Sequence, residues 1–396
     1  MSTAEPLEFN PMLPEVIADP YPLYRRLQLE DPVHQTPLGM WVVSRYDDVA
    51  MVLRDPRFGR RGFQELVAAR FSRPGFARSM LLQDPPDHTR LRALVSKGFT
   101  ARAIDSLRDR IQQILDGLLD AAIERGRMDL IADLAYPLPV SVICELMGVP
   151  APDHARFRRW SGDLARGFDS IAFPDPDVIA RANAAGDDIA AYFADLIAER
   201  RRTPRADMLS TLIAAEEASD RLSAEELLAT VVLLLLAGHE TTANLIGNGV
   251  LALLRHPAEL RRLRENPALV GSAVEELLRY DSPVQRVSRI AHEDVTVGGR
   301  TLPENSLVLV LIGAANRDAA HFHEPDRLDI ARADNRHLAF GWGIHFCLGA
   351  PLARLEGEIV FGTLVQRLPG LALLAASVEW RPTFTVRGLA ALPVRF

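Results

Sequence analysis

Apolar side chains recur every three or four positions between Thr100 and Arg202, which is the period of an amphipathic α-helix. Ile104, Leu107 and Ile111 begin this pattern, and leucines continue it at the same spacings. A helix of this kind buries its apolar stripe and leaves its charged residues in solvent. The pattern therefore predicts that this stretch of the chain is mainly helical.

A second helix is expected to be unusually long. Ser223 and Glu226 have the spacing of a capping box, in which each side chain accepts a hydrogen bond from the other residue's backbone N–H. No proline interrupts the helix that they open until Pro257, so at 1.5 Å per residue it is roughly 50 Å long. Residues 231–237 are apolar on all sides, which is typical of a helix that passes through a protein core.

Strands are predicted where runs rich in β-branched residues replace the helical period. Such runs occur at 33–36, 40–44, 295–297 and 306–312, and the last twenty residues have the pattern of a hairpin. No Ser/Gly-rich linker or internal repeat divides the chain. The pattern predicts one domain with a large helical body and small peripheral sheets.

Composition narrows the class of protein. The 396 residues include 45 Lys and Arg against 52 Asp and Glu, a net charge of −7, and 48% are hydrophobic. These values are typical of a folded globular protein, and the acidity argues against a nucleic-acid partner. Two cysteines cannot form a disulfide framework, which favours the cytoplasm. The chain shows no signal-peptide pattern and no run of about 18 apolar residues, so we expect no membrane insertion.

The strongest chemical signal is the segment Phe340–Gly349, FGWGIHFCLG. Its glycines predict a turn that needs backbone conformations, or close approaches, which a Cβ forbids. A helical run follows, so Cys347 lies at the start of a helix, where backbone N–H groups can stabilise a sulfur anion. Cys347 is therefore placed to be a thiolate, either as a nucleophile or as a metal ligand.

Other interpretations of Cys347 fit less well. A cysteine that only packs in a core would not need three glycines and His345 around it. A zinc site needs more ligands at short spacing, and only His345 is near. A cysteine hydrolase would need a partner histidine and a polar cleft, and no local signature of that class is present.

The segment resembles the haem-thiolate signature of the cytochromes P-450, F-G-x-G-x-H-x-C-x-G, at every fixed position. The resemblance extends from Asp19 to Arg387 and is closest to soluble bacterial members, including those that oxidise macrolides and other secondary metabolites. It implies a mainly α fold with small peripheral β-sheets. The expected P-450 fold is a single triangular helical domain over residues 1–396, without a fused reductase domain. The haem would lie between the long central helix and the helix after the cysteine loop.

The resemblance also implies the cofactor, haem b (iron protoporphyrin IX), with Cys347 as its metal ligand. His88, Arg92, Arg289 and His345 are expected to pair with the haem propionates, since buried carboxylates need charged donors. Phe340 is expected near the sulfur, and Gly349 close to the porphyrin. The full set of implied cofactor contacts is His88, Arg92, Ala237, Gly238, Arg289, Phe340, Gly341, His345, Cys347 and Gly349.

The long helix carries the implied catalytic pair. Residues 237–242, AGHETT, match the family's A-G-x-[DE]-T segment. Thr241 is expected to hydrogen-bond dioxygen, and Glu240 to relay protons toward it, whereas His239 turns away and has no role. Glycine and hydroxyl groups inside an apolar helix can open its backbone ladder and leave a groove.

A structural ion-pair triad is implied by the family's E-x-x-R motif. Glu276 and Arg279 match the motif, and Arg327 is expected to be the third member. The triad would brace the cysteine loop and take no part in the chemistry.

The implied reaction inserts one oxygen atom of dioxygen into a hydrophobic small molecule, by hydroxylation or epoxidation. The protein would be a monomer that receives electrons from a ferredoxin and its NAD(P)H-dependent reductase, with Lys97, Arg102 and Arg354 as docking candidates. The substrate classes left open are macrolides and other polyketides, terpenoids, steroids and fatty acids. The residues expected to line the substrate pocket are Phe63, Leu81, Leu82, Phe168, Ile171, Val284, Val287, Phe384 and Thr385.

Two alternatives stay open at this point. A haem-binding sensor or carrier that never turns over would need no proton relay. A cysteine hydrolase would be colourless and would lose its activity on alkylation of the thiol. Both differ from a monooxygenase in properties that can be measured.

Overall fold

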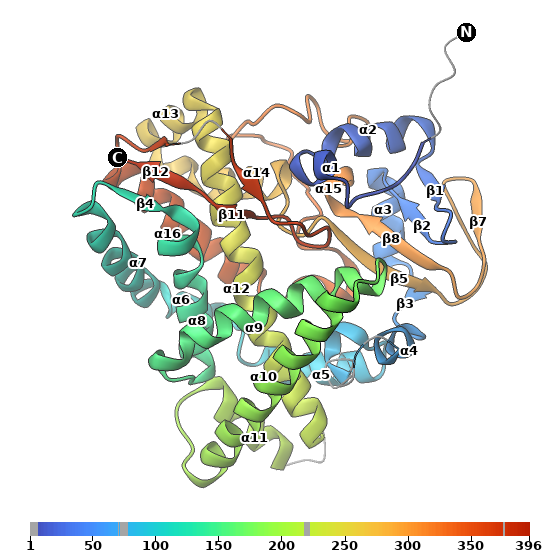
Figure 1. Cartoon of the computed structure of the whole chain (residues 1–396), viewed down its shortest axis with the longest axis horizontal. Coiled ribbons are helices and arrows are strands. Elements are labelled where there is room, and N and C mark those ends of the chain that lie inside the picture. The colour runs from blue at the N-terminus through green and yellow to red at the C-terminus, as the bar shows by residue number, and fades with distance from the viewer. Residues whose placement is uncertain (1–6, 70, 72–77, 218–221, 375–376) are drawn as a thin grey trace. The chain divides into compact units, whose positions relative to one another are not determined.

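The structure is a computed structural model that describes residues 7–69, 71, 78–217, 222–374 and 377–396 (Figure 1). Helices account for most of these residues, and the strands form small sheets. Two compact units share the chain. The first comprises the residues up to Gly59, Gly247–Cys347 and a segment that ends at Leu392; the second comprises Arg60–Ile246, Leu348–Leu374 and Pro393–Phe396. That the two units make up one domain stays a prediction.

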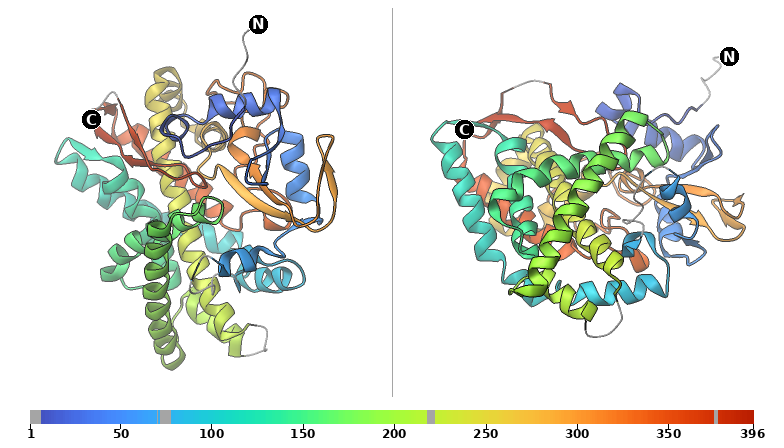
Figure 2. Two further views of the ribbon diagram at one scale, coloured as in Figure 1. Left: turned by 45° about the vertical axis from the view of Figure 1, so that its right-hand side comes forward. Right: turned by 60° about the horizontal axis from the view of Figure 1, so that its bottom comes forward.

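The first unit is built around a five-stranded sheet with the strand order β1-β2-β8-β5-β3. β2 and β8 are parallel, and the other neighbours are antiparallel. The N-terminal strands (blue) lie beside strands from far later in the chain (orange) in both views of Figure 2. The strands are β1 (Val33–Gln35), β2 (Trp41–Val43), β3 (Phe58–Gly59), β5 (Arg286–Ala291) and β8 (Leu307–Leu311).

Two short hairpins and several helices complete the first unit. Gly298 and Gly299, both at positive φ, make the turn between β6 and β7. Apolar side chains of the sheet and of α3 form one buried cluster. The remaining elements are β6 (Val295–Val297), β7 (Arg300–Leu302), β10 (Glu379–Trp380), β11 (Leu389–Ala391), α1 (Pro14–Ala18), α2 (Tyr21–Glu30), α3 (Tyr46–Arg54), α13 (Pro257–Glu265), η6 (Pro267–Leu269), α14 (Val270–Tyr280), α15 (Ile312–Ala315) and η7 (Gly343–His345).

The second unit is mainly helical. Its core is one large apolar cluster to which α8, α9, α10 and the long helix α12 contribute. A small antiparallel sheet has the order β4-β12-β9. Its elements are α4 (Phe63–Ala68), η2 (Met80–Leu82), α5 (Asp87–Ser96), α6 (Ala101–Asp105), α7 (Arg108–Ile123), β4 (Arg127–Asp129), the π-helical η3 (Ile131–Ala135), α8 (Pro137–Met147), η4 (Ala151–Asp153), α9 (His154–Gly167), η5 (Asp169–Ile171), α10 (Pro176–Arg202), α11 (Met208–Glu217), α16 (Ala350–Arg367), β9 (Ala372–Leu373) and β12 (Pro393–Arg395).

The long helix is α12 (Ala224–Arg255), which has 32 residues, and its predicted capping box is confirmed. The Ser223 amide donates to Oε2 of Glu226 at 2.8 Å, and the Glu226 amide donates to Oγ of Ser223 at 3.1 Å. An 18-residue window of α12 is apolar enough to cross a membrane, with a mean hydropathy of 1.4, but 83% of it is buried. α12 is therefore a core helix.

The helical stretch 100–202 and the predicted strands are also confirmed, with β4 as an interruption. The C-terminal hairpin was only partly correct. β10 pairs with β11, but the last strand, β12, pairs with β4 and β9 instead. β4 is distant from β12 in sequence, so no local pattern predicts this pairing.

Candidate active site

Two glycines shape the loop before Cys347. Gly341 and Gly343 both have φ = +70°, a left-handed conformation that disfavours any side chain. A Cβ on Gly343 would lie only 2.6 Å from the carbonyl oxygen of Leu53, at the end of α3. The amide of Cys347 donates to the carbonyl oxygen of Phe340 at 2.9 Å and closes the loop. The predicted need for glycine here is confirmed, and its cause is the packing of the loop on α3.

The two cysteines have opposite environments. Cys144, on α8, is 0% exposed, and burial raises the pKa of its thiol to about 12. Cys347 is exposed, three residues before α16 begins at Ala350. The preceding loop also exposes three large apolar side chains, Trp342, Ile344 and Phe346. Cys144 is a core residue, and Cys347 is the accessible thiol of the chain.

The middle of α12 presents a face of small residues. Ala237 is exposed, and Gly238 and Thr241 are partly buried, in a helix whose neighbouring positions are mostly buried. The Thr241 hydroxyl donates to the carbonyl oxygen of Ala237 at 3.2 Å. Such side-chain bonds compete with the backbone ladder, as the sequence predicted for this segment.

Gly238 also permits a close approach between two helices. A Cβ at this position would lie 2.7 Å from Cγ1 of Ile143 on α8, so any larger residue would force the helices apart. The contact between Gly238 and Ile143 holds α8 close to α12, near the turn that carries Glu240.

Sequence reasoning missed the side chain that holds Glu240. The Tyr136 hydroxyl, just before α8, donates to Oε2 of Glu240 at 2.9 Å. The same hydroxyl lies 3.0 Å from Oγ of Ser161 on α9 and 3.3 Å from Nε2 of His239. All four residues are buried. The only local sign of this site is the pair of prolines, Pro137 and Pro139, that starts α8 directly after the tyrosine.

Glu276 and Arg279 form the predicted ion pair in the first unit. Both side chains are 0% exposed, and the guanidinium binds the carboxylate through Nε at 2.8 Å and Nη2 at 2.9 Å. Nη1 of Arg279 also donates to the carbonyl oxygens of Asn316 and Pro325. The pair therefore ties α14 to the segment that leads toward the cysteine loop.

The third member of this triad is Arg332, and the prediction of Arg327 was wrong. Nε of Arg332 donates to both carboxylate oxygens of Glu276, at 3.2 and 3.1 Å. The side chain of Arg327 is 59% exposed and pairs with Glu324 instead. Arg327 contributes only its backbone carbonyl, which accepts from Arg279 and Arg332. The path of the loop, which a motif does not encode, decides which of the two side chains reaches the carboxylate.

The candidate propionate partners lie on three elements. His88 is 3% exposed and Arg92 is partly buried, and they share one face of α5. Arg289, on β5, is 3% exposed, and His345 ends η7. The structure thus brings His88 and Arg92 together. That all four meet one ligand stays a prediction.

The predicted lining residues of the first unit are partly brought together. Val284 pairs with Val386 in an isolated bridge, which places it beside Phe384 and Thr385 in the fold. Phe384 is 5% exposed, and its ring centroid lies 5.7 Å from that of Phe9. Val287 is partly buried on β5.

The predicted lining residues of the second unit lie at the ends of helices. Phe63 begins α4 and Leu82 ends η2, and both are buried, whereas Leu81 is partly exposed. Phe168 follows α9 and Ile171 ends η5. The chain between Phe63 and Leu81 lies partly outside the described residues.

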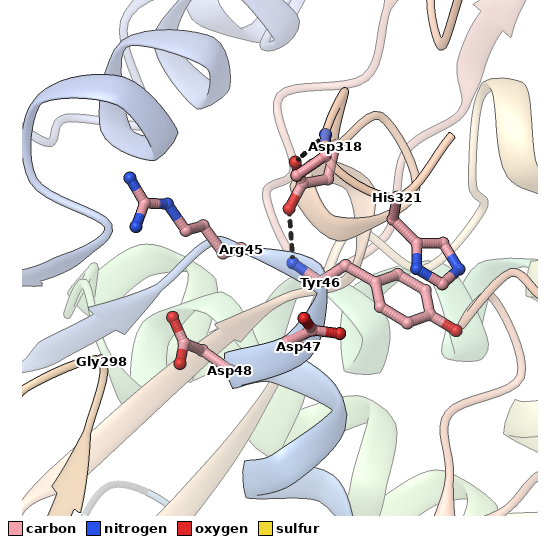
Figure 3. A pocket seen from close by; sticks show the side chains of 8 residues that line it. Arg45, Tyr46, Asp47, Asp48, Gly298, Asp318 and His321 are labelled. Carbon is pink, nitrogen blue, oxygen red and sulfur yellow. Dashed lines mark hydrogen bonds between the residues drawn. The ribbon is translucent and has the colours of Figure 1, made fainter. Parts of the chain in front are cut away.

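A separate cavity of about 350 Å³ lies in the first unit (Figure 3). Asp318 accepts hydrogen bonds there from the amides of Tyr46 and Ala320, and the rings of Tyr46 and His321 stack with centroids 3.4 Å apart. None of the residues expected around the cofactor lines it. The lining residues are Arg45, Tyr46, Asp47, Asp48, Gly298, Asp318, Ala320 and His321.

Comparison with known proteins decides the family. The family profile described as "Cytochrome P450" matches residues 33–369. The chain belongs to the cytochrome P450 family. It is 44% identical to the cytochrome P450 monooxygenase PikC of Streptomyces venezuelae over 100% of this chain and 96% of that protein. It is 46% identical to a vitamin D(3) 25-hydroxylase of Pseudonocardia autotrophica, over 95% and 93%.

Solved structures agree with this assignment. The myxobacterial cytochrome P450 CYP267B1, crystallised in complex with myristic acid, matches with a TM-score of 0.90 and 45% identity over 98% of each chain. The predicted family and the mainly helical P450 fold with small sheets are confirmed. This chain is a P450 monooxygenase of the bacterial type.

The residues of this P450 fit the haem that its family implies. A haem-thiolate centre needs one accessible sulfur, which Cys347 offers. That Ala237, Gly238 and Thr241 of the second unit contact the same haem stays a prediction. Among the described residues no three His, Cys, Asp or Glu side chains are grouped so that they could hold a metal ion.

One buried carboxyl group of this P450 is expected to lower its stability. Glu356, on α16, is 0% exposed, and neither of its carboxyl oxygens has a hydrogen-bond partner among the described residues. Desolvation therefore raises the pKa of Glu356 well above its usual value. The folded protein keeps this group protonated at a pH where the unfolded chain ionises it.

Glu356→Gln should therefore stabilise the protein at neutral pH by about 1–3 kcal/mol, because the wild type must take up a proton to fold above the unfolded pKa, at about 1.4 kcal/mol per pH unit, and glutamine need not. Below pH ~4 both states are protonated and the gain should vanish, and above it the gain should grow as the unfolded carboxyl ionises. Denaturant unfolding at several pH values measures this. Glu358→Gln, at a partly buried position on the same helix, is the control. An equal gain from both variants, or one independent of pH, would contradict the prediction.

Proposed function

We propose that Cys347 supplies the thiolate ligand of a haem b and that the enzyme inserts one oxygen atom of dioxygen into a hydrophobic small molecule. The observation that carries this proposal is the exposed thiol at the end of a loop built on two left-handed glycines. Bound haem supplies the redox chemistry that activates dioxygen. The chain has to hold that group, deliver protons and exclude water.

Different side chains of the protein perform these tasks. His88, Arg92, Arg289 and His345 neutralise the propionates, because buried carboxylates need charged donors. Thr241 places a hydroxyl on the face of α12 that carries the small residues. Glu240, the residue before it, delivers protons. The carbonyl of Ala237 and the hydroxyl of Tyr136 orient these two side chains at 3.2 and 2.9 Å.

We further propose that electrons come from a ferredoxin and its NAD(P)H-dependent reductase, as is usual for bacterial relatives, and that the enzyme works in the cytoplasm. Lys97 and Arg102 are exposed and Arg354 is partly buried, which suits docking of an acidic carrier. The substrate class is an apolar molecule in the size range of a fatty acid or a steroid. This rests on the relative named for vitamin D(3) and on the structure with myristic acid.

The reduced, carbon-monoxide-bound spectrum of the purified protein tests the ligand. We expect the red-shifted Soret band of thiolate ligation. A panel of fatty acids and steroids should then include compounds that shift the spin state on binding, and ¹⁸O₂ should label their products when ferredoxin, reductase and NAD(P)H are added. An unshifted band refutes the thiolate assignment. A shifted band with no labelled product from any binding compound would favour the haem-binding sensor or carrier.

A further inference from the structure

Hydrogen bonds link His239 and Glu240 to Tyr136 and Ser161. His239 is 0% exposed and contacts Oγ of Ser161 at 2.7 Å through Nε2. Its Nδ1 lies 2.6 Å from the carbonyl oxygen of Leu235, one turn back on α12. Tyr136 connects the two sides, because its hydroxyl reaches both Nε2 of His239 and Oε2 of Glu240.

The protons in this network can be counted from its donors and acceptors. A carbonyl oxygen only accepts, so the contact with Leu235 requires a proton on Nδ1 of His239. The Ser161 hydroxyl has one proton, and at 2.6 Å it donates to the carbonyl oxygen of Phe157. Its contact with Nε2 of His239 then requires a proton on Nε2 as well. In this arrangement His239 is a buried imidazolium.

A second arrangement holds one proton fewer. If Ser161 turns its hydroxyl proton to Nε2, His239 is a neutral imidazole and all heavy atoms keep their places. The two arrangements differ by one proton on Nε2 of His239. Two hydrogen bonds, through the Tyr136 hydroxyl, connect this nitrogen to Oε2 of Glu240. In the first, a nearby carboxylate balances the buried cation, which lowers the cost of burying either charge.

We propose that His239 is a proton store that recharges Glu240 through the hydroxyl of Tyr136. The proposal rests on the proposed function and adds two residues to its proton path. The N–H bond at Nε2 breaks as an O–H bond forms at Tyr136, while the Tyr136 proton passes to Oε2 of Glu240. One imidazolium and one carboxylate become one imidazole and one carboxylic acid, and no electrons are exchanged.

The backbone holds Tyr136 in this position by two independent features. A π-helical turn precedes it, and the Tyr136 amide donates to the carbonyl oxygen of Ile131 at 3.1 Å, five residues back. Isolated π-turns are frequent at functional sites because they re-aim a side chain. On α12, Gly238 allows α8 to approach closely enough for the tyrosine to reach Glu240. The sequence had left His239 without a role, and the network gives it one.

The variants Tyr136→Phe and His239→Gln test the proposal in the complete enzyme with its cofactor and redox partners. The measured quantity is the product formed per NAD(P)H oxidised, with a substrate that shifts the spin state. Loss of one proton-transfer step should lower this ratio about 10-fold, and D₂O should lower it further. Tyr192→Phe and His154→Gln are matched controls. Tyr192 also donates to a carboxylate, that of Asp153, and His154 also contacts a carbonyl oxygen, that of Val149.

A second readout needs no turnover. ¹⁵N-histidine NMR of the ferrous carbon monoxide form, assigned with His239→Gln, should show protons on both Nδ1 and Nε2 of His239 in the wild type, because only the charged form stores the extra proton. A wild-type protein without the red-shifted band or labelled product would refute the proposed function. If the wild type turns over but both variants stay as coupled as their controls, only the proton store fails. A neutral His239, without a proton on Nε2, would also overturn it.

Discussion

Replacing Cys347 with alanine should abolish the red-shifted Soret band of the reduced carbon monoxide complex and lower turnover more than about 100-fold. The loop conformation is set by Gly341 and Gly343 and by the Cys347 amide, none of which the substitution touches. The variant should therefore fold but lack the axial sulfur. Even the outer partners of metal ligands are worth 10–100-fold in metal affinity or activity, so loss of the ligand itself should cost more.

The other cysteine provides the control. Cys144→Ala removes a buried thiol that is not expected to bind the haem. The variant should therefore keep the red-shifted band and lose some stability through packing alone. The spectra of the two variants, each recorded with equal amounts of protein and haem, make the comparison. Retention of the band in Cys347→Ala would contradict the assignment, since no sulfur would remain in the loop.

Local signals in the sequence predicted much of this structure. The capping box of Ser223 and Glu226 and the left-handed glycines Gly341 and Gly343 are confirmed, because each depends on a few neighbouring residues. The period of the apolar positions predicted the helical body and the burial of α12 for the same reason. Local patterns of this kind can be recognised without knowledge of the fold.

Contacts between distant segments were not predictable. Tyr136 meets Glu240 across 104 positions, and its local sequence is that of any helix start. The last strand, β12, does not complete the predicted hairpin but pairs with β4, where Val394 lies opposite Met128. In both cases the packing of whole elements decides the contact. The sequence of either segment alone does not contain that information.

Arg332→Ala should destabilise the protein by about 2–4 kcal/mol, whereas Arg327→Ala should change its stability by less than about 1 kcal/mol. Arg332 is 11% exposed and binds a carboxylate that is fully buried. Its guanidinium also donates to the carbonyl oxygen of His323 at 2.7 Å. Removing it leaves Glu276 with Arg279 as its remaining arginine. Arg327 has an exposed partner, and such pairs are worth little.

The two variants also separate a local effect from an effect on the thiolate loop. Glu276 accepts hydrogen bonds from the Asp329 amide at 2.9 Å and from the Asn335 side chain at 3.2 Å, so it organises the segment that leads to Leu338 and the cysteine loop. Arg332→Ala should therefore also speed the loss of the red-shifted band on warming. Denaturant unfolding and the decay of that band measure the two effects. Equal behaviour of the two variants would contradict the structural role given to Arg332, because only the buried partner of Glu276 should produce a difference.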